Sequence, residues 1–116
     1  SLTDGTGNDA ERQTDIRALE TQLEAFYAQN GYYPDLNDLN NPQWVSTNLT
    51  GIDKEVLKDP QGSGYTLAAK PAAHVYAYQP TSTAGGVCSE AKQDCQKYTL
   101  TATLSNGSSY TKASLN

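Results

Sequence analysis

The sequence of 116 residues has no methionine and only one histidine, one phenylalanine and one tryptophan. It contains no apolar run close to the roughly 18 to 20 residues that a membrane-spanning helix needs, and no signal-peptide pattern. Its single histidine, His74, has no recognisable nucleophile motif beside it, so a structural or solvated role is expected for this side chain. These absences predict a protein that is not an enzyme.

Positive charge is also scarce. Eight Lys and Arg residues face 13 Asp and Glu residues, and the net charge at pH 7 is −5. A phosphate backbone is bound mainly by clustered Lys and Arg, which this composition does not supply. Nucleic-acid binding is therefore disfavoured.

Only two cysteines are present, Cys88 and Cys95, in a loop that also bears Gly, Ser and Gln. This spacing fits neither a C-x-x-C redox motif nor a zinc site with several ligands. A disulfide closing the short loop would stabilise the fold by about 2.5 kcal/mol on the chain-entropy estimate. It would also indicate an oxidising, extracytoplasmic compartment, whereas two free thiols in the cytosol are the alternative.

The residues that are abundant are tyrosine, serine and threonine, with eight tyrosines in the chain. Aromatic and β-branched residues suit a half-buried pleated surface, so a thin sheet exposed on one side is predicted. Four tyrosines could line a ligand surface, although pairing across the sheet explains them more simply. They are Tyr32, Tyr33, Tyr76 and Tyr78.

An amphipathic helix is predicted over residues 9 to 29, after a flexible lead-in or tag remnant at residues 1 to 8. Asn8 can cap this helix with Glu11 at the capping-box position, and Asn30-Gly31 supplies the stop. Apolar side chains follow the helical period along one stripe, which needs a partner surface. The stripe consists of Ile16, Leu19, Leu23 and Phe26.

Residues 30 to 64 form a predicted connecting region, rich in turn formers but with several apolar anchors. One short helix is expected at Ile52 to Leu57. Trp44 is expected to cover one end of the core.

From residue 65 to residue 116 apolar side chains recur at every second position. This alternation predicts an antiparallel sheet of roughly four strands. The expected strands are Tyr65 to Ala69, His74 to Gln79, Tyr98 to Leu104 and Ser109 to Lys112. The fold class is therefore α+β, with the helix packed on the sheet in a single domain over residues 9 to 116. The predicted helix–sheet core consists of Ile16, Leu19, Leu23, Phe26, Tyr98, Leu100 and Leu104.

Ser105-Asn106-Gly107 is a strong hairpin signal. A two-residue turn would place Tyr110 opposite Thr103. We favour a three-residue turn with Gly107 in the left-handed region, which returns Tyr110 to the core side.

No catalytic, cofactor or metal residue is predicted. Glu20 and Glu24 share a helix face but are expected to be solvated. Asp35-x-Asn37 begins like a calcium loop, yet the glycine and glutamate that such a loop needs are missing. Glu90 and Asp94 are too few to identify a calcium site, and calcium binding stays an open alternative.

Two segments, Gly31-Tyr32-Tyr33-Pro34 at the helix end and Asp59-Pro60-Gln61-Gly62 before Tyr65, stand in an order that resembles the globular part of type IV pilins and pseudopilins. The resemblance covers nearly the whole chain from residue 9. It implies an additional N-terminal apolar helix, processed by a prepilin peptidase, that anchors the subunit in the membrane and then packs in the filament core. The cysteines depart from the commonest pilin pattern, in which a disulfide encloses a larger C-terminal region.

The expected function is that of a structural subunit of a bacterial surface filament serving adhesion, motility or uptake. Its expected partners are other subunits, the assembly machinery and a host or surface receptor, and its location is extracellular after a membrane-anchored stage. Two alternatives remain: a pseudopilin of a type II secretion system, and a secreted ligand-binding module without an anchor.

Overall fold

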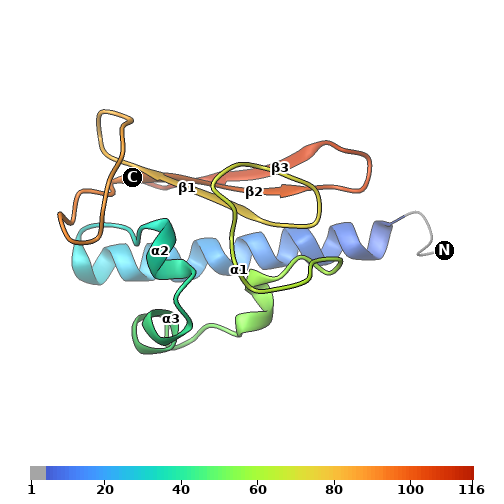
Figure 1. The fold of residues 1–116 in the computed structure, drawn as a ribbon, viewed down its shortest axis with the longest axis horizontal. Coiled ribbons are helices and arrows are strands. Elements are labelled where there is room, and N and C mark those ends of the chain that lie inside the picture. The colour runs from blue at the N-terminus through green and yellow to red at the C-terminus, as the bar shows by residue number, and fades with distance from the viewer. Residues whose placement is uncertain (1–4) are drawn as a thin grey trace.

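A computed structural model describes residues 5–116 of the chain. The long helix α1 (Thr6–Asn30) runs through the middle of the molecule, with the sheet on one side and α3 (Pro42–Asn48) and η2 (Lys54–Leu57) on the other (Figure 1). The short helix α2 (Leu36–Leu39) lies near the C-terminal end of α1. The layout is α+β, as predicted.

Within residues 5–116 the sheet has three antiparallel strands, in the order β1 (Ala77–Thr81), β2 (Lys97–Thr103) and β3 (Ser109–Ala113). Strand β2 is central, and its buried apolar residues Tyr98, Leu100 and Ala102 alternate with threonines, of which Thr101 is also buried. The observed alternation matches the predicted one and directs the apolar row of β2 toward α1.

The predicted strand at Tyr65 to Ala69 does not form, so the expectation of four strands is wrong. The side chain of Asn40 takes the place of a neighbouring strand: its Oδ1 accepts from Leu67 N at 2.7 Å and its Nδ2 donates to Leu67 O at 3.0 Å. Only Ala68 pairs with the chain at the start of β1, as an isolated bridge to Ala77. The predicted strand at His74 to Gln79 begins later, at Ala77, because residues 72 to 75 form a turn.

Helix α1 begins at Thr6, earlier than expected, so Asn8 lies inside the helix and is not its cap. Gly5 precedes the helix with φ 83°, and its carbonyl accepts from Asp9 N at 2.9 Å. A Cβ at Gly5 would collide with the side chain of Ser105, so glycine is required there. Residues 1–4 of the expected lead-in lie outside the described residues. Gly31 ends α1 with φ 82°, as predicted.

The connecting region contains more helix than predicted. Asp35 and Asp38 form a capping box that starts α2, and Asn41 caps α3 with Pro42 in its first turn. Both are recognisable start signals that the turn-forming composition of the region obscures. The helix expected at Ile52 to Leu57 is the shorter 3₁₀ helix η2.

The core lies between α1, β2 and the connecting segments. Six of the seven predicted core residues are buried: Ile16, Leu19, Leu23, Phe26, Tyr98 and Leu100. Leu104, the seventh, is only partly buried because β2 ends at Thr103 and the chain turns immediately afterwards. Trp44 packs against Phe26 with ring centroids 5.3 Å apart and covers that side of the core, as expected.

The turn between β2 and β3 has the predicted three residues. Gly107 has φ 88°, Gly107 N donates to Leu104 O at 2.9 Å, and Leu104 N donates to Ser108 O at 2.8 Å. Tyr110 pairs with Ala102 rather than Thr103, which puts it on the core side of the sheet. Among residues 5–116, no helix combines the length and apolar character needed to cross a membrane.

Candidate functional site

A buried ion pair lies near the N-terminal end of α1. Arg12 and Asp59 are each 1% exposed. Arg12 Nε donates to Asp59 Oδ2 at 2.8 Å, and Arg12 Nη2 donates to Asp59 Oδ1 at 3.1 Å. These two bonds raise the pKa of Arg12 despite the opposing effect of its burial. Arg12 therefore stays charged inside the protein, which is tolerable only because its guanidinium group is so fully bonded.

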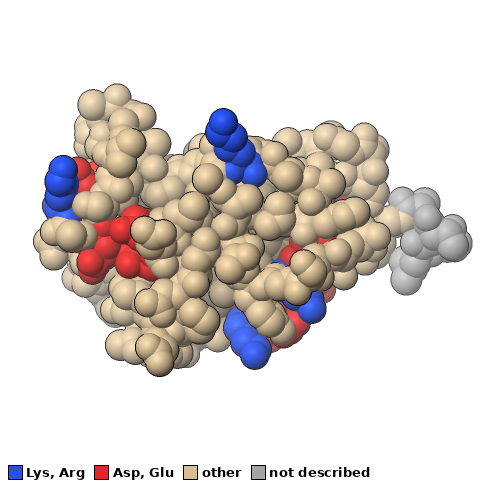
Figure 2. All heavy atoms as spheres, in the orientation of Figure 1, with Lys and Arg blue, Asp and Glu red and all other residues tan. Residues whose placement is uncertain are grey.

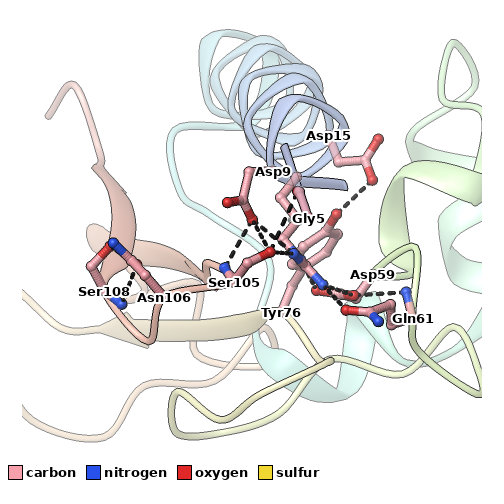
Figure 3. Close-up of polar contacts among 10 residues, drawn as sticks. Gly5, Asp9, Asp15, Asp59, Gln61, Tyr76, Ser105, Asn106 and Ser108 are labelled. Carbon is pink, nitrogen blue, oxygen red and sulfur yellow. Dashed lines mark hydrogen bonds and ion pairs between the residues drawn. The ribbon is translucent and has the colours of Figure 1, made fainter. Parts of the chain in front are cut away.

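Three more side chains complete what we call the N-terminal network, drawn in Figure 3. Arg12 Nη2 donates to Gln61 Oε1 at 2.7 Å, and Arg12 Nη1 donates to Asp9 Oδ1 at 2.8 Å and to Ser105 Oγ at 3.2 Å. Ser105 N also donates to Asp9 Oδ1, at 2.9 Å. The network joins α1 to the turn after η2 and to the β2–β3 hairpin. Its members are Asp9, Arg12, Asp59, Gln61 and Ser105.

A second buried acid, Asp15, lies beside this network. It is 2% exposed, and its Oδ2 accepts from the hydroxyl of Tyr76 at 2.6 Å. Burial, followed by the interaction with Glu11, raises the pKa of Asp15 to about 8. At neutral pH this carboxyl group therefore keeps its proton. Because Asp15 and Tyr76 are both sealed from solvent, they have no direct access to a substrate.

The other end of α1 is held by what we call the C-terminal clamp, formed by Tyr32, Tyr33, Asp35, Glu90 and the disulfide. The disulfide between Cys88 and Cys95 is present, with Cα atoms 5.0 Å apart. Tyr33 N donates to Cys95 O at 2.7 Å, and Glu90 N donates to Asp35 Oδ2 at 2.9 Å. The disulfide loop is thereby fastened to the turn that follows α1.

Glu24 is not simply solvated, contrary to expectation. Tyr33 OH donates to Glu24 Oε1 at 2.8 Å, and Tyr98 OH donates to Glu24 Oε2 at 2.7 Å. Burial is the main reason that the pKa of Tyr33 rises to about 12, so its hydroxyl remains a donor at neutral pH. The carboxylate of Glu24 gives two largely buried tyrosine rings a polar partner.

Acidic side chains gather at the end of the molecule where α2 lies (Figure 2). Asp35 Oδ1 accepts from Asp38 N, Asp38 Oδ2 accepts from Asp35 N, and Asp94 Oδ1 accepts from Ser89 N. Burial raises the pKa of Asp38 to about 6. Within the described part of the chain, no three His, Cys, Asp or Glu residues are grouped so that they could hold a metal ion.

A groove of about 340 Å³ opens between α3 and η2. Its apolar lining comes from Leu39, Pro42, Val45, Leu49, Ile52 and Leu57. Tyr65 stands at 37% exposure among the lining residues, and Lys54 Nζ lies 5.0 Å from the centre of its ring. Of the residues that the structure describes, Lys54 is the one charged side chain that lines the groove.

The remaining candidates occupy structural positions. Tyr32, Tyr33, Tyr76 and Tyr78 are 8% exposed or less, so they belong to the core and do not form a ligand surface. His74 is exposed in a turn with φ 65°.

Sequence reasoning missed Arg12, Asp15 and Asp59. A signal for two of them exists, because Arg12 and Asp15 continue the stripe of Ile16 and Leu19 at helical spacing. Charged residues on an apolar stripe indicate buried partners.

Comparisons with family models, with curated proteins and with solved structures gave no match to this chain.

Proposed function

We propose that the chain is the globular domain of a pilin-like filament subunit. The observation that carries this proposal is that the two segments that resemble those of pilins both hold α1 in place. The Gly31-to-Pro34 turn enters the C-terminal clamp through Tyr33, and Asp59 of the Asp-Pro turn holds Arg12 in the N-terminal network. Two segments far apart in the sequence thus both hold α1 against the rest of the domain.

A helix that is held at both ends suits a filament subunit. The 25 residues of α1 are about 37 Å long at 1.5 Å per residue. A subunit that transmits load along such a rod must prevent the rod from sliding against the sheet. In the proposed assembly α1 continues a rod toward the filament core, and the sheet faces outward. Other subunits, the assembly machinery and a surface receptor are its proposed partners, with a membrane-anchored stage before assembly.

Surface filaments sheared from the native cells provide the test. Mass spectrometry of these filaments is expected to find peptides of this chain together with an apolar segment preceding α1. An Arg12→Met variant is expected to reduce filament yield, whereas the exposed variant Lys92→Ala is expected to assemble normally. Filaments that contain no trace of this chain would overturn the proposal. If removal of this chain from the cells stops protein export but leaves the surface filaments in place, the result would instead favour a secretion pseudopilin.

One observation favours a second candidate function, that of a ligand-binding module. The groove between α3 and η2 combines an apolar lining with a single cation, Lys54. Ligand pockets commonly pair an apolar lining with a few polar groups that orient the ligand. The matching ligand is an aliphatic chain that ends in a carboxylate.

Calorimetric titration with a series of straight-chain carboxylates tests this candidate. Each added methylene is expected to raise the affinity about fourfold until the groove is filled. Lys54→Ala is expected to weaken binding of the carboxylates but not of the corresponding alcohols. Lys112→Ala is the matched control, since Lys112 also lies over a tyrosine ring but outside the groove. Absence of binding at any chain length rejects this candidate.

A further inference from the structure

The chain contains two Asn-Gly dipeptides in opposite structural settings. Asn30-Gly31 ends α1, and Asn106-Gly107 forms the tip of the β2–β3 hairpin. The chemistry open to an asparagine before glycine is attack of the glycine backbone nitrogen on the asparagine side-chain carbon Cγ. Glycine favours this attack because it has no Cβ to obstruct it. Whether the attack occurs depends on how each asparagine is held.

The side chain of Asn106 is held in a way that assists this reaction. Its Oδ1 accepts from Ser108 N at 2.9 Å and from Ser108 Oγ at 2.7 Å (Figure 3). Donors at this distance stabilise the negative charge that develops on a carbonyl oxygen under attack, as in an oxyanion hole. No hydrogen bond of Asn106 Nδ2 is found among the described residues, so the leaving nitrogen is unrestrained.

Gly107 can also reach the reactive conformation. Its N–H donates to Leu104 O at 2.9 Å, and this bond must open before the nitrogen can attack. Residues 105 to 109 are all exposed, and the space where a Cβ of Gly107 would lie is empty to 4 Å. Exposed hairpin tips open locally at little free-energy cost.

Asn30 is exposed too, but its conformation prevents the attack. Its Nδ2 donates back to Phe26 O at 2.9 Å, one turn earlier in α1. Helical side chains point toward the N-terminus, away from the nitrogen of the following residue. Gly31 is held from both sides, since its N–H donates to Tyr27 O at 2.8 Å and its carbonyl accepts from Gln96 Nε2 at 2.9 Å.

We infer that Asn106 is a site of spontaneous deamidation in the folded protein and that Asn30 is protected. The Gly107 nitrogen gives up its proton to solvent base and forms a bond to Asn106 Cγ, and the Cγ–Nδ2 bond breaks as Nδ2 takes a proton from water and leaves as ammonia. Water then opens the resulting cyclic imide. Cleavage of one imide bond yields aspartate, and cleavage of the other yields isoaspartate, in which the backbone passes through the side chain. Neither step involves oxidation or reduction.

The product alters the hairpin where it meets α1. Either product adds a carboxylate one residue away from Ser105, which donates to the carboxylate of Asp9. Isoaspartate also lengthens the main chain by one methylene, which the three-residue turn cannot accommodate unchanged. Deamidation is therefore expected to loosen the link between the hairpin and the N-terminal network.

Ageing of the folded protein in mildly alkaline buffer tests the inference. Peptide mapping is expected to show the conversion of amide to acid at Asn106, with isoaspartate among the products, while Asn30 keeps its amide. The same incubation in concentrated denaturant under reducing conditions should remove the difference, because both dipeptides are then unstructured. Conversion of Asn30 as fast as Asn106 in the folded protein would overturn the inference, and so would persistent protection of Asn30 in denaturant.

The contribution of Ser108 is measured with two matched variants. Ser108→Ala removes the hydroxyl donor to Asn106 Oδ1 and is expected to slow conversion about two- to tenfold, the effect of one hydrogen bond. Ser109→Ala removes a neighbouring exposed hydroxyl without contact to Asn106 and is expected to leave the rate unchanged. An unchanged or faster rate in Ser108→Ala would show that the Ser108 hydroxyl does not assist the reaction, and it would refute that part of the inference.

Discussion

The two ends of α1 are held to the rest of the domain by different physical means. At the N-terminal end, a charged side chain is buried and satisfied by a network of polar partners around Arg12. At the C-terminal end, the C-terminal clamp combines backbone hydrogen bonds with a disulfide, and the ring of its Tyr33 packs 4.5 Å from the ring of Tyr27 in α1. The first depends on every partner being present, whereas the second depends on shape and covalent closure. The ends should therefore fail in different ways.

The largest effect is expected from Arg12→Met, which leaves Asp59 buried without its cation. Breaking a buried ion pair on one side costs about 3–5 kcal/mol. The double variant Arg12→Met with Asp59→Asn should be less destabilised than Arg12→Met alone, because no uncompensated charge remains. Urea unfolding measures both free energies. Equal or greater loss in the double variant would contradict the view that an unpaired charge is the main penalty.

Removing the disulfide with Cys88→Ala and Cys95→Ala is expected to lower the free energy of unfolding by about 2.5 kcal/mol through loop entropy. Hydrogen exchange should locate this effect at the C-terminal clamp, with faster exchange at the Tyr33 amide that donates to Cys95 O. The Ser105 amide, which donates to Asp9, is the internal control. Equal acceleration at Ser105 would show that the two ends are not independent.

A pH titration separates the two ends by one acid at each end whose pKa is raised, Asp15 and Asp38. The folded pKa of Asp15 is raised from 3.8 to about 8, so between these values the folded state holds a proton that the unfolded chain has released. The free energy of unfolding should therefore fall as pH rises, by at most about 1.4 kcal/mol per pH unit from this group. Asp38 at the other end adds an effect of the same sign only up to about pH 6.

Between pH 6 and pH 8 the Asp15 contribution is thus separated from that of Asp38. Asp15→Asn is expected to flatten the decline of stability in this interval. Asp38→Asn is the matched variant and should change the profile at lower pH. If the free energy of unfolding of Asp15→Asn falls with pH as steeply as that of the wild type, the proton on Asp15 is not linked to folding.

The smallest effect is expected from Ser105→Ala, which removes the hydroxyl that accepts from Arg12 and donates to Asp9. The loss should be about 0.5–1.5 kcal/mol, since the backbone bond from Ser105 N to Asp9 persists. Thermal unfolding measures it against Ser109→Ala, which should match the wild type. A loss as large as that of Arg12→Met would place the hydroxyl, rather than the ion pair, at the centre of the network.

The sequence predicts the C-terminal end of α1 better than the N-terminal end. Gly31 as a helix stop and the disulfide are local features, readable from neighbouring residues, and both are confirmed. Asp59 pairs with a residue 47 positions away, and no local pattern specifies such a partner. Charged residues on a helix are usually assumed to be solvated, so the burial of Arg12 and Asp15 is missed.

The strand predictions show the same contrast between local features and distant partners. Alternation around Leu100 identifies β2 correctly because that strand has one apolar face, formed by Tyr98, Leu100 and Ala102. The alternation at Tyr65 to Ala69 is equally regular, yet the chain there bonds to the side chain of Asn40 instead of to a full strand. Periodicity reports which side chains can be buried, but it does not report which backbone lies alongside.

The segment around Leu67 and Ala68 has a consequence for association between molecules. Ala68 bonds to the outer edge of β1 near Tyr76 and Tyr78, so another chain cannot extend that edge without displacing it. At the opposite edge, Lys112 of β3 lies on the same side of the strand as Tyr110 and is partly buried. An added strand would bury this inward-facing charge, a common protection against edge pairing. Any association between copies of this domain is therefore expected to use side-chain surfaces and not to lengthen the sheet.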